Sequence, residues 1–180
     1  MPARHPALPA PLPITWLISD ARNDGALAKA LARLPRGSGF IFRHYHLAAA
    51  PRAARFAALA RLCRRFGHVA VWSGSAADAR AAGASGCYGS PALLARGPKL
   101  LRLVTAHSLR EIRMVRRADA VLLSPVFPTR THPGGASLGA VRFHLLAARS
   151  RVPVIALGGM NHQTARRLQM LRWAAIDGLS

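Results

Sequence analysis

Short runs of β-branched and aromatic residues alternate with longer segments rich in Ala, Leu and Arg along nearly the whole chain from Ile14 onward. The runs have the length and composition of strands, and the longer segments repeat their apolar residues at helical spacing. Such regular alternation is the signature of consecutive βαβ units. The chain is therefore predicted to form an α/β fold around a parallel sheet.

The pattern defines each element in turn. The predicted strands cover residues 15–19, 39–45, 68–72, 86–88, 100–104, 120–123, 152–157 and 173–177. The predicted helices cover residues 24–34, 51–66, 76–83, 108–117, 141–150 and 162–171. Asn23 is the expected N-cap of the first helix, and Ser108 with Glu111 three residues on is an expected capping box.

Uniform βα alternation closes most naturally into a small TIM-type (βα)8 barrel, with an open doubly wound sheet as the alternative. The chain has 180 residues, fewer than the ~250 usual for such barrels. Little follows the last predicted strand, so we expect the eighth helix to be reduced or missing. Residues 14–180 form the expected barrel domain, and residues 1–13 an N-terminal tail or a cover for the barrel bottom.

Features of the whole chain favour a soluble cytoplasmic protein. No stretch approaches 18 uninterrupted apolar residues, and the start lacks the apolar region of a signal peptide. Cys63 and Cys87 lack the spacing of a zinc site or a redox motif, so both are expected to be buried thiols. We expect no membrane partner, and the oligomeric state stays open.

The formal charge of +20 comes from 26 basic and 6 acidic residues. Arginines interleaved with alanine are typical of solvent-facing helix stripes and also of surfaces for anionic partners. They are spread along the whole chain and form no block of five or six like charges, and nucleic acid is the least favoured partner.

Carboxylates are scarce, which bears on metal binding. A magnesium site normally uses one or two carboxylates beside the phosphates of a substrate. The chain has only Asp20, Asp24, Asp78, Glu111, Asp119 and Asp177. Few metal sites can be built from these residues, and we expect no metal and no other cofactor.

Phosphate-binding candidates lie in the loops after the sixth and seventh strands. In a TIM barrel these loops build the site, and backbone amides after the last strands commonly hold phosphate. Gly158 and Gly159 fall at that place, where the missing Cβ lets the amides approach a phosphate. The preceding loop carries Thr129, Thr131 and His132 on a proline-stiffened backbone, which suits an anion clamp. A plain turn and an irregular surface loop are the alternatives.

His107 ends the fifth-strand segment on the same predicted face. An imidazole titrates near neutral pH, so it can take up and return a proton. Beside a predicted phosphate site, we interpret His107 as catalytic, with a structural or exposed histidine as the alternative. Arg43, His44 and His46 close the second strand and would add cationic groups to the same mouth.

Three segments carry a family resemblance: VTAHS at 104–108, ADAVLLSPVFPTRTHPG at 118–134 and VPVIALGGM at 152–160. In this order they resemble the thiamine phosphate synthase and thiazole tautomerase (TenI-type) family of thiamine-biosynthesis barrels. TWLISD near the start, IFR in the second strand and GASG near position 85 fit the same order. The resemblance covers most of the chain and implies a TIM-type barrel that binds a phosphorylated thiazole.

The resemblance also implies roles for loop residues. Thr129 and Thr131 match the hydroxyls that hold the thiazole phosphate, and Gly158 and Gly159 match its backbone cradle. His132 stands where synthases of the family usually have a lysine.

Departures from the family concern the metal site. Synthases of the family share an Asn-Asp pair after the third strand and an acid after the fourth, which hold Mg²⁺ and the pyrimidine pyrophosphate. Here Ser73 and Gly74 occupy the first place and residues 90–93 the second, without a carboxylate. Arg43 matches the arginine of the strand-two motif, but Tyr45 stands where a lysine for the pyrophosphate is expected.

The resemblance therefore favours a metal-free, tautomerase-like isomerase with His107 as the proton shuttle. The first alternative is a thiamine phosphate synthase, a Mg²⁺-dependent transferase that joins a pyrimidine pyrophosphate to a thiazole phosphate, with a degenerate metal site. The second alternative is a non-catalytic barrel that binds a thiamine precursor or RNA.

Overall fold

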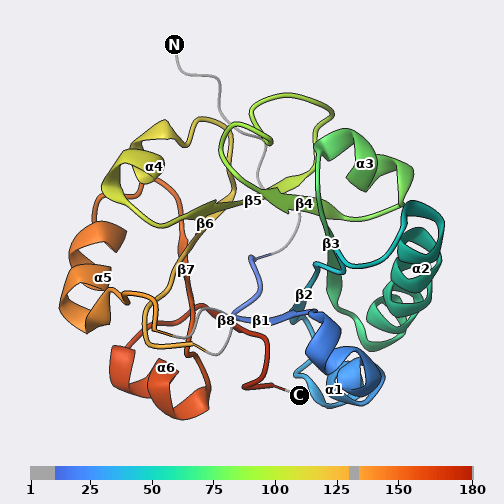
Figure 1. The fold of residues 1–180 in the computed structure, drawn as a ribbon, viewed down its shortest axis with the longest axis horizontal. Helices are drawn as coiled ribbons and strands as arrows, with labels where there is room; N and C mark the ends of the chain where they lie inside the picture. Colours follow the sequence, from blue (N-terminus) through green and yellow to red (C-terminus); the bar gives the residue numbers. More distant parts are fainter. Residues whose placement is uncertain (1–10, 130–133, 180) are drawn as a thin grey trace.

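Eight parallel strands form a closed barrel in the order β1-β2-β3-β4-β5-β6-β7-β8 (Figure 1). The computed structural model describes residues 11–129 and 134–179. The strands are β1 (Thr15–Ile18), β2 (Gly39–Phe42), β3 (Val69–Ser73), β4 (Gly86–Gly89), β5 (Leu101–Ala106), β6 (Ala120–Leu123), β7 (Val154–Leu157) and β8 (Trp173–Ala175). The predicted TIM-type barrel is confirmed, and the open-sheet alternative is wrong because β1 pairs with β8 as well as with β2.

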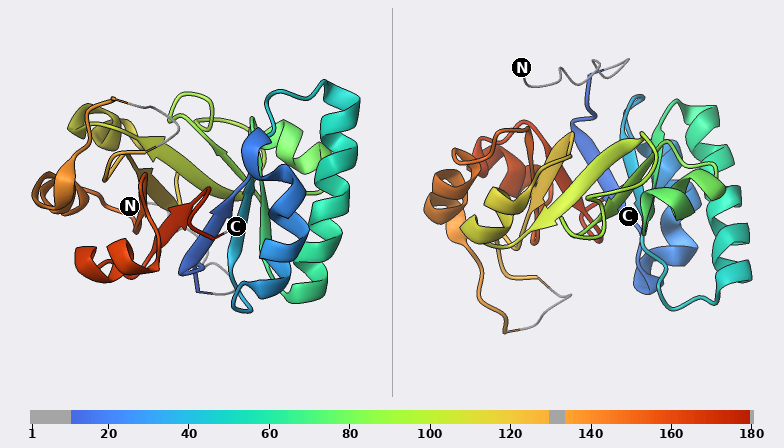
Figure 2. Two further views of the ribbon diagram at one scale, coloured as in Figure 1. Left: turned by 60° about the horizontal axis from the view of Figure 1, so that its bottom comes forward. Right: turned by 90° about the horizontal axis from the view of Figure 1, so that it is seen from above.

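Helices cover the outside of the ring of strands (Figures 1 and 2). They are the 3-10 helix η1 (Ala21–Ala26) and the α-helices α1 (Leu27–Arg33), α2 (Ala49–Phe66), α3 (Ala76–Ala81), α4 (Leu109–Met114), α5 (Gly139–Ala147) and α6 (His162–Leu168). No helix follows β8 in the part described up to Leu179. No helix of the described residues is long and apolar enough to cross a membrane.

Side chains alternate between the barrel interior and the layer under the helices. Trp16, Ile18 and Ile41 join the interior cluster, whereas Leu17 and Phe40 pack outward among residues of α1 and α2. This two-residue period is what a strand buried on both faces requires. Residues 1–10 of the predicted tail lie outside the described residues, as do residues 130–133 and 180.

Two predicted helix caps are corrected by the structure. Asp20 caps η1, and Asn23 is the third residue of that helix, so the prediction that Asn23 is the N-cap is wrong. Asn23 is buried instead, and its amide donates to the carbonyls of Ile18 and Ile176 at 3.1 and 3.0 Å. These bonds join the ends of β1 and β8, so the Asn23 side chain links the two strands whose pairing closes the barrel.

The capping box predicted at the start of α4 is only half formed. The Ser108 hydroxyl accepts the amide of Glu111, as predicted. The Glu111 carboxylate, however, accepts the backbone N–H of His107 rather than that of Ser108. The acidic side chain thus holds the backbone at the candidate catalytic residue.

The predicted free and buried thiols are confirmed for both Cys63 and Cys87. Burial raises the pKa of the Cys63 thiol to about 12 and also raises the pKa of Cys87. Both therefore stay protonated and serve as small apolar core residues.

Candidate active site

A pocket of about 580 Å³ opens at the carboxyl ends of the strands, where a TIM barrel carries its site. It brings together Arg43, His107, Thr129 and Gly158 from separate loops, as the sequence predicts. The remaining lining residues are Tyr45, Ser73, Gly74, Tyr88, Gly89, Ser90, Leu93, Thr105, Ser124, Pro125, Phe127, Pro128, Gly135, Ala136, Leu157 and Ile176. Thr131 and His132 lie outside the described residues, so their predicted roles stay predictions.

The glycine pair after β7 has a backbone that other residues rarely adopt. The φ angles of Gly158 and Gly159 are +95° and +64°. A Cβ on Gly158 would lie 2.7 Å from Pro125 Cα, and one on Gly159 would lie 2.7 Å from Phe127 Cβ. The loop after β6 is therefore seated directly on both glycines, a contact that only a missing side chain allows.

Backbone hydrogen bonds fix that loop to the end of β7. The amide of Val126 donates to Leu157 O at 2.9 Å, and that of Phe127 donates to Gly158 O at 3.1 Å. The N–H groups of Gly158 and Gly159 donate to no partner within residues 11–129 and 134–179. The carbonyls of Leu157 and Gly158 are thus used by the fold, and the Gly158 amide stays available at the pocket. Gly159 is not among the described lining residues, so its predicted contact with phosphate stays a prediction.

His107 is exposed and lines the pocket, just after β5. Its Nδ1 lies 2.8 Å from the backbone carbonyl oxygen of Ser124. Because a carbonyl only accepts, Nδ1 carries the proton in the neutral ring, and Nε2 keeps its lone pair. No described residue hydrogen-bonds to Nε2, which makes it a free proton acceptor.

Arg43 supplies a guanidinium to the same pocket from the segment after β2. Its backbone N–H donates to the Ser19 hydroxyl at 2.8 Å. Its guanidinium carbon lies 5.8 Å from the centroid of the Tyr45 ring. In the described part of the chain the guanidinium makes no hydrogen bond, so its donors are open to an anion.

The place expected for a metal is taken by other groups. The Tyr45 hydroxyl hydrogen-bonds to the Ser73 hydroxyl, and the Arg52 guanidinium donates to the Ser73 carbonyl at 2.6 Å. Arg52 also stacks 4.1 Å from the centroid of the Trp72 ring. The Ser73 oxygens are thus already hydrogen-bonded, one of them to a guanidinium. The nearby Asp78 carboxylate accepts from Ser75 and is not among the described pocket lining.

Carboxylates are absent from the described pocket lining. Nor does any group of three or more His, Cys, Asp or Glu side chains gather into a possible metal site within the described residues. Magnesium prefers carboxylate oxygens, so the residues present do not fit that ion.

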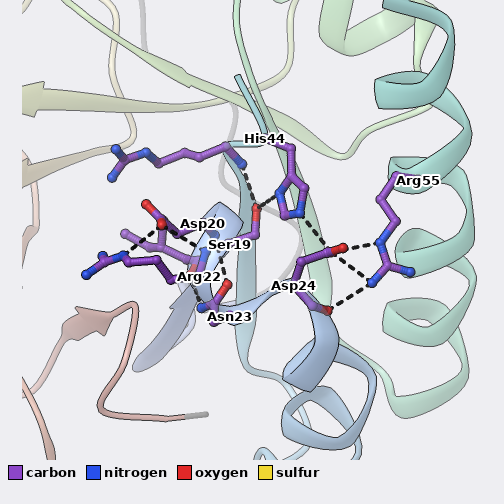
Figure 3. Close-up of polar contacts among 9 residues, drawn as sticks. Ser19, Asp20, Arg22, Asn23, Asp24, His44 and Arg55 are labelled. Atoms are coloured by element: carbon purple, nitrogen blue, oxygen red, sulfur yellow. Dashed lines mark hydrogen bonds and ion pairs between the residues drawn. The ribbon is translucent and has the colours of Figure 1, made fainter. Parts of the chain in front are cut away.

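A polar network that includes the fully buried Ser19 and His44 was not predicted from the sequence; Figure 3 shows its side chains. His44 does not line the pocket, so the interpretation of His44 as a cation at the mouth is wrong. The His46 ring lies against the His44 ring, with centroids 5.0 Å apart and planes tilted by 40°, and His46 is not among the described lining. The signal available was a polar Ser-Asp pair directly after the first strand, beside Arg-His after the second.

Burial and hydrogen bonding set the protonation of this network. Burial lowers the pKa of His44, although its hydrogen bond to Asp24 opposes the shift. Burial alone would raise the pKa of the Asp24 carboxyl, but hydrogen bonds from Arg55 and His44 outweigh it and lower the pKa. At neutral pH the histidine is thus neutral and the carboxylate is charged.

Solved barrels with this fold include several enzymes. A thiamine phosphate pyrophosphorylase from Pyrococcus furiosus superposes with a TM-score of 0.75 and 20% identity, over 92% of this chain and 85% of that one. The corresponding protein from Bacteroides thetaiotaomicron gives 0.61 and 15%, over 90% and 81%. The YdjI aldolase from Escherichia coli K12 gives 0.61 and 8%, over 92% and 75%. At these identities the likeness shows the fold.

Sequence comparison is more specific. A thiamine-phosphate synthase from Anoxybacillus flavithermus is 33% identical over 69 residues, a stretch that spans 36% of this chain and 32% of that protein. The profile of the family described as thiamine monophosphate synthase matches residues 15–178, which include the whole barrel. The chain therefore belongs to the thiamine monophosphate synthase family.

Proposed function

We propose that the protein is a metal-free isomerase of this family that moves a proton on a phosphorylated thiazole carboxylate. The observation that carries the proposal is the free Nε2 of His107, which borders a pocket whose described lining contains no carboxylate. Proton transfer by a positioned imidazole needs no metal. No cofactor enters the proposed reaction.

The proposed mechanism begins with substrate binding. The backbone amide of Gly158, together with Thr129, would hold the phosphate in the pocket. The open guanidinium of Arg43, which lines the same pocket, would receive the carboxylate. With both ends of the substrate anchored, the ring would lie between them and beside His107.

His107 would then act as both base and acid. Nε2 removes a proton from one ring position, and the resulting imidazolium returns it at another position, so the product is an isomer with no net change in protons. The Nδ1–H bond to the Ser124 carbonyl supports both states, because Nδ1 is a donor in the neutral and in the charged ring.

The synthase reaction is the weaker candidate for this chain. Departure of a pyrophosphate develops negative charge that needs stabilisation, and a magnesium ion does not fit the donors at Ser73 and residues 90–93. Without it, the described lining offers Arg43 and His107 as the cationic or protonatable groups for that charge.

The test replaces His107 by Asn, whose amide can still donate to the Ser124 carbonyl but has no basic nitrogen. Isomerisation of the phosphorylated thiazole carboxylate, followed by NMR, should fall by about 10²–10⁴-fold, with ligand affinity nearly unchanged. His46→Asn is the matched control, because His46 is exposed and outside the described pocket lining. Equal turnover in the two variants would refute the role of His107.

A further inference from the structure

Ser19, His44, Asp24 and Arg55 form a hydrogen-bonded network that contacts the backbone of Arg43; Figure 3 labels these four side chains. Ser19 Oγ lies 2.8 Å from His44 Nδ1, and His44 Nε2 lies 2.8 Å from the Asp24 carboxylate. Arg55 of α2 donates to the same carboxylate at 2.8 Å and to the Asp24 carbonyl at 3.0 Å. The network thus extends from the end of β1, past the end of β2, to the helix layer.

The hydrogen-bond partners determine which atoms of this network carry the protons. The Arg43 amide donates to Ser19 Oγ, and the hydroxyl proton of Ser19 then has His44 Nδ1 as its acceptor. Since Nδ1 accepts, Nε2 of the neutral ring carries the proton and donates it to Asp24. In this arrangement the donors of the Arg43 amide, Ser19 and His44 each have an acceptor, and these hydrogen bonds are donated in the direction from Arg43 to Asp24.

The order Ser-His-Asp is that of an activated nucleophile, but the surroundings exclude that use. Ser19 and His44 are both 0% exposed, and neither lines the described pocket. The Ser19 oxygen already accepts the Arg43 amide, so no substrate can reach it. The network therefore holds neighbouring residues in place and does not react with a substrate.

At the pocket end the network meets Arg43, whose backbone N–H donates to Ser19. The Arg43 side chain lines the pocket, whereas the adjacent His44 is fully buried and is not among the described lining residues. The His44 ring also stacks on Phe42, with centroids 4.6 Å apart and planes 9° apart. Both the amide of Arg43 and the residue after it are thereby held in place.

We propose that Ser19, His44, Asp24 and Arg55 are positioning residues that fix Arg43 where it meets the anionic group of the ligand. The inference rests on the proposed function only in that Arg43 is the anion contact. A guanidinium contact is directional, so a small backbone shift at Arg43 weakens it.

The test measures binding of inorganic pyrophosphate, as a probe anion, by calorimetry in buffer with EDTA. The variants are Ser19→Ala, Arg43→Met and the double variant. Arg43→Met should weaken binding by about 10-fold or more, and Ser19→Ala by about 3- to 10-fold. In the Arg43→Met background, Ser19→Ala should have no further effect, since its action passes through Arg43.

A second variant guards against loss of folding. Asp24 is partly exposed, so Asp24→Ala removes the outer acceptor with less damage to the core, and it should show the same dependence on Arg43. Equal weakening by Ser19→Ala in both backgrounds, or no weakening at all, would overturn the positioning role. Unchanged pyrophosphate binding in Arg43→Met would overturn the proposal, because Arg43 would then not be the anion contact. The isomerase role of His107 is tested separately, by the turnover of His107→Asn.

Discussion

Replacement of Gly159 by Ala tests whether the seat of the β6 loop on the glycine pair is required. The new Cβ would lie 2.7 Å from both Phe127 Cβ and Pro128 O. Neither atom is the end of a flexible side chain, so the loop backbone must move.

The structure offers a matched control in Gly83, which follows α3. Its φ is +69°, against +64° for Gly159, and a Cβ at Gly83 would have no atom within 4 Å. The left-handed backbone costs a non-glycine residue about 1–2 kcal/mol at either position. Overpacking against the loop adds about 1–3 kcal/mol, and this part applies only to Gly159.

We therefore expect Gly83→Ala to lower the free energy of unfolding by about 1–2 kcal/mol and Gly159→Ala by about 2–5 kcal/mol. Urea denaturation measures both values. The displaced loop carries the pocket-lining residues Phe127, Pro128 and Thr129. Inorganic phosphate, titrated by NMR, should therefore bind about tenfold more weakly to Gly159→Ala, which corresponds to about 1.4 kcal/mol of binding free energy. Equal stability and equal phosphate affinity in the two variants would refute the argument.

Three further predictions concern stability and reactivity. Burial lowers the pKa of His44 below 6.5, so as pH falls the unfolded chain takes up the extra proton before the folded chain does. The stability contributed by the neutral ring is complete above pH 6.5 and is lost as pH falls through the folded pKa. In a pH series of urea denaturation curves, the free energy of unfolding should therefore depend less on pH in His44→Phe than in the wild type. Arg102 is 6% exposed and its Nη2 donates to the carbonyls of residues 96, 97 and 98. Arg102→Met should therefore lower the free energy of unfolding by about 2–4 kcal/mol, whereas Arg113→Met, at an exposed site, should lower it by less than about 0.5 kcal/mol. Thermal denaturation of the two variants compares these values. Cys63, with a pKa of about 12, should react with a thiol reagent at pH 8 only after unfolding, and rapid labelling of the native protein would contradict its burial.

The fold could be predicted from the sequence because each strand is a compact apolar run and each helix shows its period locally. The predicted strand at 120–123 matches β6 residue for residue, and α6 begins at His162 as predicted. Strand ends were predicted less well: the predicted second strand, 39–45, runs three residues past the end of β2 at Phe42, where the chain enters a turn at residues 45 and 46.

The site could be predicted in part. His107 and Gly158 were found because each follows a strand, and that alone brings them to the same end of a parallel barrel. The network at Ser19 was missed because His44 lies 25 residues away in sequence, and nothing in a local pattern tells a buried histidine from one that faces a pocket. Asn23 was misplaced as a cap since Asp20, three residues earlier, can also cap a helix.

The proposed function requires proton transfer on the thiazole without a metal. The most direct measurement incubates the protein and the phosphorylated thiazole carboxylate in EDTA and follows the isomers by NMR. We expect the same rate of isomerisation in EDTA as in Mg²⁺. Absence of isomerisation, together with Mg²⁺-dependent joining of a pyrimidine pyrophosphate to the thiazole phosphate, would contradict it.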